Sequence, residues 1–445
     1  MKPMELNWKF LLVLFVFTTL CLSPLFFREW PPGTDPYWTA KNLENGIKPP
    51  GYPPGFFLLM GFLPWHPIYM TIYPILMTFF LALEAGFLTQ YFITNHGDGT
   101  YEPKPPDSTR KQGKVAKFIK PLLQKHPGWL ASFLVFGFPV FIFRNGFFEE
   151  DLLGMIFALA GVYFVAKCFY EDKQEGSHLF LAAMFFFIAV SIWRGAVFFV
   201  LLSGLAGLLK QRKRELLLFL LVGTVLAGIY TMDMNGVPVP NLKVSEALPG
   251  VIYLVPGLLF GLLGVYSLRF MDWFQRIYAG GFFLLACYMA RFCFLSVPFL
   301  AFGMVLFLRA ARPDKAAFVV NVFMVSGVIV GLGWLFVVVP SAELMEDLSV
   351  AIELSGGEAI ANEWRFGHWI NYLGGKAEFS PLYNADDIPG SNASWVLGDC
   401  SMVFEMGVSQ DLVTGGVSTW REAVLAGNFS RSGFCLFHRH RLPVR

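Results

Sequence analysis

The chain has 445 residues, of which 55% are hydrophobic, 17% aromatic and only 15% charged. Soluble domains carry about 25% charged residues, so this composition excludes a water-soluble globule and indicates a membrane protein. The net charge of +2 does not indicate any class of partner. The basic residues stand in short runs between apolar segments, where membrane orientation explains them, so the sequence does not favour nucleic-acid binding.

Eleven apolar segments are long enough, or nearly long enough, to cross a bilayer. In chain order they are residues 10–27, 68–94, 129–143, 152–168, 178–193, 195–209, 216–231, 250–267, 277–290, 294–309 and 316–340. No small-residue cleavage site follows the first segment, so we expect a retained span and not a removed signal peptide. The sequence predicts an all-α polytopic membrane protein with about 11 transmembrane helices.

The basic residues between the spans predict the orientation of the chain. Segment 95–128 has seven basic residues against three acidic ones, and a second basic run begins at Lys210. Such loops stay on the cytoplasmic side. We therefore expect a multi-pass protein of the cell membrane with a cytoplasmic N-terminus. The loops 28–67, 144–151 and 232–249 and everything after residue 340 would lie outside.

The polar, glycine-rich tail predicts a second domain. Residues 1–340 would form the transmembrane catalytic domain and residues 341–445 a short external one. Two of the six cysteines, Cys400 and Cys435, fall in this tail, and an external location favours a disulfide between them.

Acidic residues stand at three points of the predicted outer face. Asp35 precedes a proline in the first loop, which predicts an extended or turn conformation with an available carboxylate. It could instead cap a helix that follows it over residues 37–45 and lies along the membrane surface. Glu149 and Asp151 lead directly into the span 152–168, and Glu246 lies in the third loop.

These acids have a structural interpretation and a functional one. Acids in a first helical turn are favoured by the helix dipole, so Glu149–Asp151 could be capping charges. Three adjacent acids repel one another unless a cation is shared, and hard carboxylate oxygens suit Mg²⁺ or Mn²⁺. Carboxylates gathered at one membrane face favour an enzyme that acts at the membrane surface. A transporter or scaffold is the non-enzymatic alternative, but transporters place polar groups at the bilayer midplane.

Two further positions carry a possible function. Arg291 stands in a nearly continuous apolar stretch, where a cation is costly and should meet an anion such as a phosphate or a carboxylate. The segment Trp364–Trp369 (WRFGHW) holds three aromatic residues, which could form the core of the external domain or a binding surface.

Taken in order, these pieces resemble the catalytic subunit of oligosaccharyltransferase, a GT-C-type membrane glycosyltransferase, and above all its single-subunit archaeal and bacterial forms. Segment Gly146–Leu153 (GFFEEDLL) is similar to the family's second acidic motif, and Val244–Glu246 to a motif of its mobile external loop. Segment Glu363–Gly367 (EWRFG) is similar to a degenerate form of the family's Trp-Trp-Asp-Tyr-Gly block. Arg291 is similar to the arginine that contacts the donor diphosphate.

The resemblance implies a metal-dependent enzyme that transfers a glycan from a polyprenyl- or dolichyl-linked donor to an asparagine of an external protein or peptide. It implies these residue roles: Mn²⁺ or Mg²⁺ ligands Asp35, Glu149, Asp151 and Glu246; catalytic residues Asp35 and Glu246; donor-diphosphate contact Arg291; acceptor contacts Glu363, Trp364 and Arg365. Membrane lipids would surround the spans. The sequence indicates no accessory subunit.

The acceptor block departs from the family pattern. Arg365 stands where the family has an aspartate, and Glu363 where it has a tryptophan, so a cation replaces a hydrogen-bond acceptor and the acceptor rule is open. A related enzyme using a sugar linked to a lipid monophosphate, of the O-mannosyl- or aminoarabinosyl-transferase kind, is the alternative. Segment Lys48–Pro54 (KPPGYPP) is similar to those enzymes, although their first loop carries adjacent acids.

Overall fold

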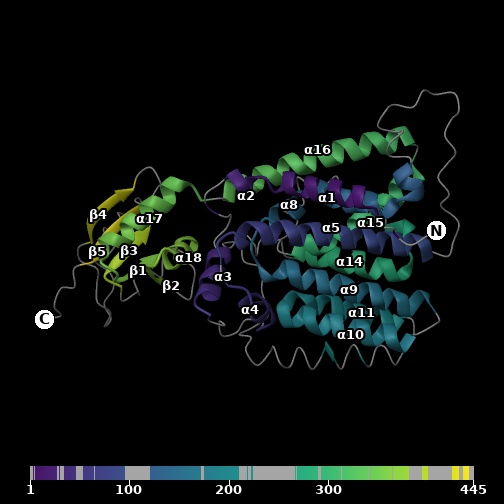
Figure 1. Cartoon of the computed structure of the whole chain (residues 1–445), viewed down its shortest axis with the longest axis horizontal. Helices are drawn as coiled ribbons and strands as arrows, with labels where there is room; N and C mark the ends of the chain where they lie inside the picture. The colour runs from purple at the N-terminus through teal and green to yellow at the C-terminus, as the bar shows by residue number, and fades with distance from the viewer. Residues whose placement is uncertain are drawn as a thin grey trace. The chain divides into compact units, whose positions relative to one another are not determined.

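The computed structural model covers the whole chain (Figure 1). It describes most of residues 4–95, 121–209 and 266–379, the short segments 393–398, 423–429 and 434–439, and a few isolated positions between 210 and 265. The chain divides into two compact units. Unit 1 is Met1–Phe26 with Lys48–Val337, and unit 2 is Phe27–Ile47 with Val338–Arg445.

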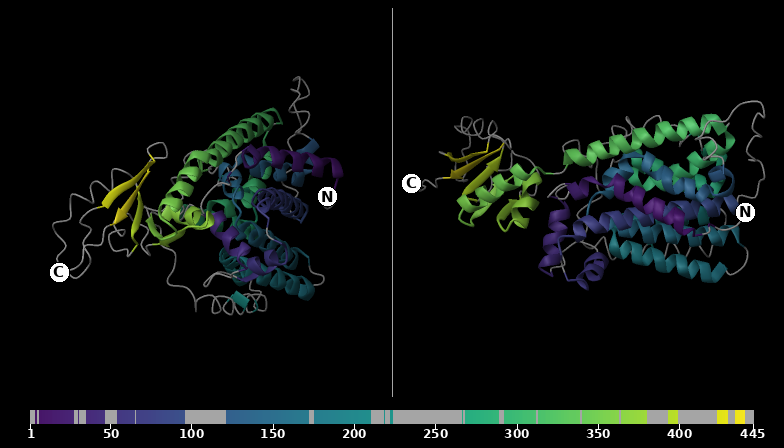
Figure 2. Two further views of the ribbon diagram at one scale, coloured as in Figure 1. Left: turned by 60° about the vertical axis from the view of Figure 1, so that its left-hand side comes forward. Right: turned by 45° about the horizontal axis from the view of Figure 1, so that its top comes forward.

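Unit 1 is built from helices that run side by side (Figures 1 and 2). The helices are α1 (Trp8–Cys21), α2 (Pro24–Phe27, at the border with unit 2), α4 (Pro54–Gly61), α5 (Tyr69–Asn95), α7 (Pro127–Leu134), α8 (Pro139–Asn145), α9 (Glu150–Tyr170), α10 (Glu175–Ile192), α11 (Val197–Leu209), α14 (Trp273–Tyr288), α15 (Cys293–Ala310) and α16 (Pro313–Val338). The 3-10 turns are η2 (Val135–Gly137), η3 (Arg194–Ala196) and η5 (Leu268–Phe270).

Several of these helices are long and apolar enough to cross a membrane, which indicates a membrane protein. Within the described residues they number four: Tyr69–Asn95, Glu150–Tyr170, Cys293–Ala310 and Lys315–Phe336. A bent pair of shorter helices, α7 with η2 and then α8, would make five. Apolar helices α1, α10 and α11 are shorter. The predicted spans 216–231 and 250–267 lie outside the described residues, so the number eleven stays a prediction.

The predicted span 129–143 is not one helix. It breaks between α7–η2 and α8, which meet at 78°. Phe138 at the break has an extended backbone, with φ −92° and ψ 111°. Pro139 follows it and becomes the first residue of α8, because a proline disfavours helical geometry in the residue before it but suits a helix start. The break was therefore readable from the proline.

Helix α16 lies along the outside of the bundle (Figure 2). It packs on the broken span through one face. Phe323, Gly327, Gly331 and Leu335 are four residues apart and all buried, so they share that face. The ring of Phe323 packs on Phe138, with centroids 4.9 Å apart. A Cβ at Gly327 would lie 2.0 Å from the Gly137 carbonyl oxygen. The two backbones can approach this closely only because neither residue has a side chain.

We predict that Gly327→Ala destabilises the protein, because its Cβ would force the backbone of α16 away from Gly137. Overpacking of this kind costs about 1–3 kcal/mol. Gly333→Ala is the matched control on the same helix, where a Cβ would meet nothing within 4 Å. Thermal unfolding of the purified protein in one detergent compares the two. Equal melting temperatures would contradict the close packing of α16.

Unit 2 combines helices with a mixed sheet, whereas the sequence predicts no secondary structure for the C-terminal tail. Its elements are α3 (Asp35–Glu44), α17 (Ala342–Leu354), α18 (Trp364–Tyr372), β1 (Ala359–Asn362), β2 (Lys376–Phe379), β3 (Trp395–Gly398), β4 (Ala423–Phe429) and β5 (Phe434–Arg439). The strand order is β2-β1-β3-β5-β4. Strands β2 and β3 run parallel to β1, whereas β5 is antiparallel to both β3 and β4. Most strands have only four residues, too few for a clear alternation of apolar and polar side chains.

Helix α18 connects the parallel neighbours β1 and β2, so these three elements form a β-α-β unit. The ring of Phe366 on α18 packs on Phe434 of β5 at 5.4 Å and joins the helix to the sheet. Cys435, next along β5, is disulfide-bonded, and Cys400 lies outside the described residues. Cys21, Cys287 and Cys293 of unit 1 are free thiols.

Helix α3 also belongs to unit 2, although the predicted domain boundary placed it with the transmembrane helices. The helix begins at Asp35 and was expected to lie along the membrane surface. Its residues Tyr37 and Ala40 are fully buried within the protein. The apolar face of α3 therefore packs on unit 2, and the first loop and the C-terminal region fold together.

We predict that the stability of unit 2 falls as the pH is lowered from 6.5 toward 4. His368 on α18 is 5% exposed, and burial lowers its pKa from 6.5 to about 4. The folded state therefore resists protonation that the unfolded chain accepts. The contribution of His368 to the free energy of unfolding is fully present above pH 6.5. It decreases by roughly 3 kcal/mol as the pH falls to 4. Denaturation midpoints across this pH range measure it, and His368→Gln should flatten the profile. An unchanged slope in that variant would contradict the assignment.

Candidate functional site

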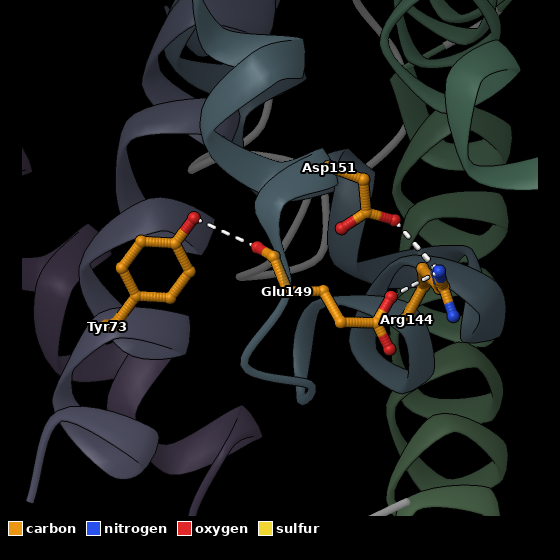
Figure 3. Close-up of polar contacts among 4 residues, drawn as sticks. All are labelled: Tyr73, Arg144, Glu149 and Asp151. Carbon is orange, nitrogen blue, oxygen red and sulfur yellow. Dashed lines mark hydrogen bonds and ion pairs between the residues drawn. The ribbon is translucent and has the colours of Figure 1, made fainter. Parts of the chain in front are cut away.

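The described part of the candidate site is the connection from α8 to α9. Arg144 lies in the last turn of α8, Glu149 is the N-terminal cap of α9, and Asp151 lies in the first turn of α9. Local sequence explains the geometry. Pro139 starts α8, and the apolar run after Asp151 continues α9 through the membrane-length span. The two helix ends meet with all three charged side chains between them (Figure 3).

Both carboxylates bind the same guanidinium group. Arg144 Nη2 lies 2.5 Å from Glu149 Oε2. The same nitrogen and Nε each lie 3.0 Å from Asp151 Oδ2. The three residues are 7%, 8% and 3% exposed, so the charges are removed from water. Two carboxylates therefore share one cation in a buried setting, where loss of that cation would be costly.

One carboxylate oxygen has no such contact. Asp151 Oδ1 is buried and has no hydrogen-bond partner among the described residues. Neither amide atom of the fully buried Asn145, next to Arg144, has a partner there. Nearly all buried polar groups in proteins are paired with protein, water or an ion. The two oxygens, Asp151 Oδ1 and Asn145 Oδ1, could therefore accept a cation or a hydrogen bond, and Asn145 Nδ2 could donate one.

Aromatic residues hold the connection from two sides. The Tyr73 hydroxyl, from α5, donates a hydrogen bond of 2.9 Å to the backbone carbonyl of Glu149 (Figure 3). The Phe148 ring packs on Tyr73 at 5.1 Å, and Phe147 packs beneath the Arg144 guanidinium at 5.6 Å. The two phenylalanines of the acidic motif thus anchor the backbone that carries the acids.

The residues present fit a hard divalent cation in part. Glu149 and Asp151 supply carboxylate oxygens, and the unpaired Oδ1 of Asp151 is of the type that Mg²⁺ and Mn²⁺ prefer. No group of three or more acids, histidines or cysteines comes together within the described residues. A metal bound here would need further ligands, which the resemblance assigns to Asp35 and Glu246.

The other predicted site residues lie elsewhere or outside the described part. Asp35 is the first residue of α3 in unit 2, and its side chain lies outside the described part. Glu246, Arg291 and Glu363 lie outside the described residues altogether. Trp364 and Arg365 open α18 just after β1 ends, and their side chains lie outside the described part. Of the predicted metal ligands, the structure thus brings together Glu149 and Asp151.

Sequence reasoning assigned no role to Arg144 and did not consider Glu84. The signal for Arg144 was its position, five and seven residues before the two acids on the same predicted loop. Glu84 lies in the middle of α5, where the interior was expected to be nearly free of charge. Its Oε2 is buried without a hydrogen-bond partner among the described residues. An ionisable group within a span is a candidate functional residue.

Comparison with protein-family models and with curated proteins gives no match to this chain. The chain is therefore assigned to no family on that ground. The function is therefore inferred from the ion pairs of Arg144 with Glu149 and Asp151 at the start of α9 and from the motifs of the sequence.

We predict that Arg144→Ala strongly destabilises unit 1, because it leaves Glu149 and Asp151 buried without their shared cation. Breaking a buried ion pair in this way costs about 3–5 kcal/mol. The matched control is the triple variant Arg144→Ala, Glu149→Gln, Asp151→Asn, which removes all three charges and should recover much of the loss. Denaturant unfolding in detergent measures both. Arg144→Ala with wild-type stability would show that the guanidinium does not compensate the acids.

Proposed function

We propose that the protein is a membrane glycosyltransferase of the oligosaccharyltransferase type. It would transfer a glycan from a polyprenyl- or dolichyl-linked donor to an acceptor outside the membrane, with an asparagine side chain of a protein as the implied acceptor. The supporting observation is the buried set of Arg144, Glu149 and Asp151, in which one carboxylate oxygen of Asp151 has no hydrogen-bond partner among the described residues. The order of the sequence motifs supplies the reaction class.

The geometry supports separate tasks for the two oxygens of Asp151. Arg144 binds Oδ2 and so fixes the orientation of the carboxylate. Oδ1 is then held in a fixed position, where it could bind a cation or accept a hydrogen bond from an N–H group. Preorganised charge in a water-poor site stabilises developing charge better than the same groups in water.

The proposed reaction explains why acids would be needed. Displacement of a lipid diphosphate builds negative charge on the leaving group, and a bound Mn²⁺ or Mg²⁺ would neutralise that charge. Glu149 and Asp151 would hold the ion, with Asp35 and Glu246 as further ligands on the resemblance. An amide nitrogen is a weak nucleophile, so carboxylates that accept hydrogen bonds from its N–H groups, the role proposed for Asp35 and Glu246, would activate it. Arg291 would bind the diphosphate.

We predict that Asp151→Asn lowers glycan transfer at least about 100-fold, because the amide keeps the shape but loses the charge on the oxygen proposed for the cation. The assay uses purified membranes, a lipid-linked oligosaccharide, an asparagine-containing peptide and Mn²⁺. Glu149→Gln should have a similar effect. Glu150→Gln is the matched control, because it removes the neighbouring acid that is assigned no ligand role, and it should retain activity.

Two outcomes of this assay would count against the proposal. Equal activity in Asp151→Asn and wild type would overturn the site assignment. No transfer by wild type to any peptide would overturn the asparagine acceptor. A parallel reaction with a sugar on a lipid monophosphate would then test the alternative donor class directly.

A further inference from the structure

The helix that carries Asp35 is built into the C-terminal unit. Residues 27–47 group with residues 338–445, and α3 is the helix of that segment. Asp35 is the first residue of α3 and Tyr37 stands two residues later, within the same helical turn. A helix rises about 1.5 Å per residue, so the backbone of Asp35 lies about 3 Å along the axis from that of Tyr37. Whatever fixes Tyr37 therefore fixes the backbone of Asp35.

Tyr37 is fixed by two rings of α18. Its side chain is 0% exposed. Its ring centroid lies 5.0 Å from that of Tyr372 and 6.4 Å from that of Trp369, both at nearly perpendicular angles of 79° and 87°. Trp369 and Tyr372 are one turn apart on α18 and share a face. Edge-to-face pairs of this kind contribute about 0.5–1.5 kcal/mol each beyond area burial and restrict ring orientation.

The contact continues into the sheet. Trp369 packs on Phe366 at 6.3 Å, and Phe366 packs on Phe434 of β5 at 5.4 Å. Helix α18 is itself the crossover between the parallel strands β1 and β2. A continuous series of rings thus connects the first turn of α3 to the core of the C-terminal unit. The exposed side of α3 carries a surface ion pair, Lys41–Glu44 at 3.1 Å, which adds little to stability.

We propose that Tyr37 is a positioning residue, which holds the acid-bearing turn of α3 on α18 and so sets the place of Asp35. The role in the reaction rests on the proposed function, in which Asp35 is a catalytic carboxylate. The C-terminal unit then carries both the turn with Asp35 and the block Trp364–Arg365 assigned to the acceptor. Binding of an acceptor to that block and the position of Asp35 would be mechanically linked through α18.

The experiment measures mobility and turnover on the same full-length protein in nanodiscs. Tyr37→Ala removes the ring, Tyr37→Phe keeps the ring and removes the hydroxyl, and Lys41→Ala removes the exposed ion pair of the same helix. Hydrogen–deuterium exchange reports on α3 and, as a check of folding, on β1 and β5. Transfer kinetics with the lipid-linked donor and an asparagine peptide give kcat and the two KM values.

In Tyr37→Ala we expect exchange in α3 to rise and kcat to fall, each roughly tenfold or more, while the donor KM and the exchange of β1 and β5 stay at wild-type values. Lys41→Ala should behave as wild type, and Tyr37→Phe, which keeps the ring against α18, should stay closer to wild type than Tyr37→Ala. Tyr372→Ala, which removes the nearer ring from α18 and leaves α3 unaltered, should reproduce the effect even if Tyr37→Ala fails to fold.

Unchanged exchange in α3 in both ring-deleting variants would overturn the proposal. Loosened α3 with wild-type kcat would also overturn it, because the contact would then be structural only. No transfer by the wild type overturns the proposed function and the catalytic meaning of Tyr37. The exchange data would still show whether Tyr37 holds α3, so the two failures are distinguishable.

Discussion

The shared guanidinium of Arg144 is the interaction on which the candidate site depends. Two carboxylates, Glu149 and Asp151, lie within 3.0 Å of it while all three groups are almost fully buried. Burial of charge is costly, and a buried ion pair repays that cost only with good geometry. Such a group is weak evidence of stabilisation. In the proposed function, its place at the start of an apolar helix supplies charge where water is scarce.

The surrounding helices support that geometry by two different packing modes. On one side, aromatic rings and the Tyr73 hydroxyl hold the backbone of the acidic motif. On the other side, α16 lies against the broken span through glycines, and Leu335 occupies the space that a side chain at Gly146 would fill. Within a membrane, where lipid is as apolar as leucine, close contact of this kind replaces the hydrophobic effect as the force between helices. The position of Arg144 thus depends on residues far from it in sequence.

Unit 2 shows a different use of aromatic residues. The first loop contributes a helix whose Tyr37 ring lies between two rings of α18, so a segment near the N-terminus completes a C-terminal domain. The aromatic segment Trp364–Trp369 was open to two interpretations. Phe366 and Trp369 are buried and belong to the core of unit 2, whereas the side chains of Trp364 and Arg365, to which the acceptor contact is assigned, lie outside the described part.

The sequence by itself determined the features that local chemistry controls. Composition indicated a membrane protein, apolar length located α5, α9 and α15, and the acids were correctly placed at the start of α9. The tertiary structure alone decided that Arg144 binds both acids, that α3 folds with the C-terminal sheet, and that β1 lies between β2 and β3. Periodicity and propensity report on neighbours along the chain. Ring contacts, strand order and ion-pair partners depend on which distant segments meet, and no local pattern contains that information.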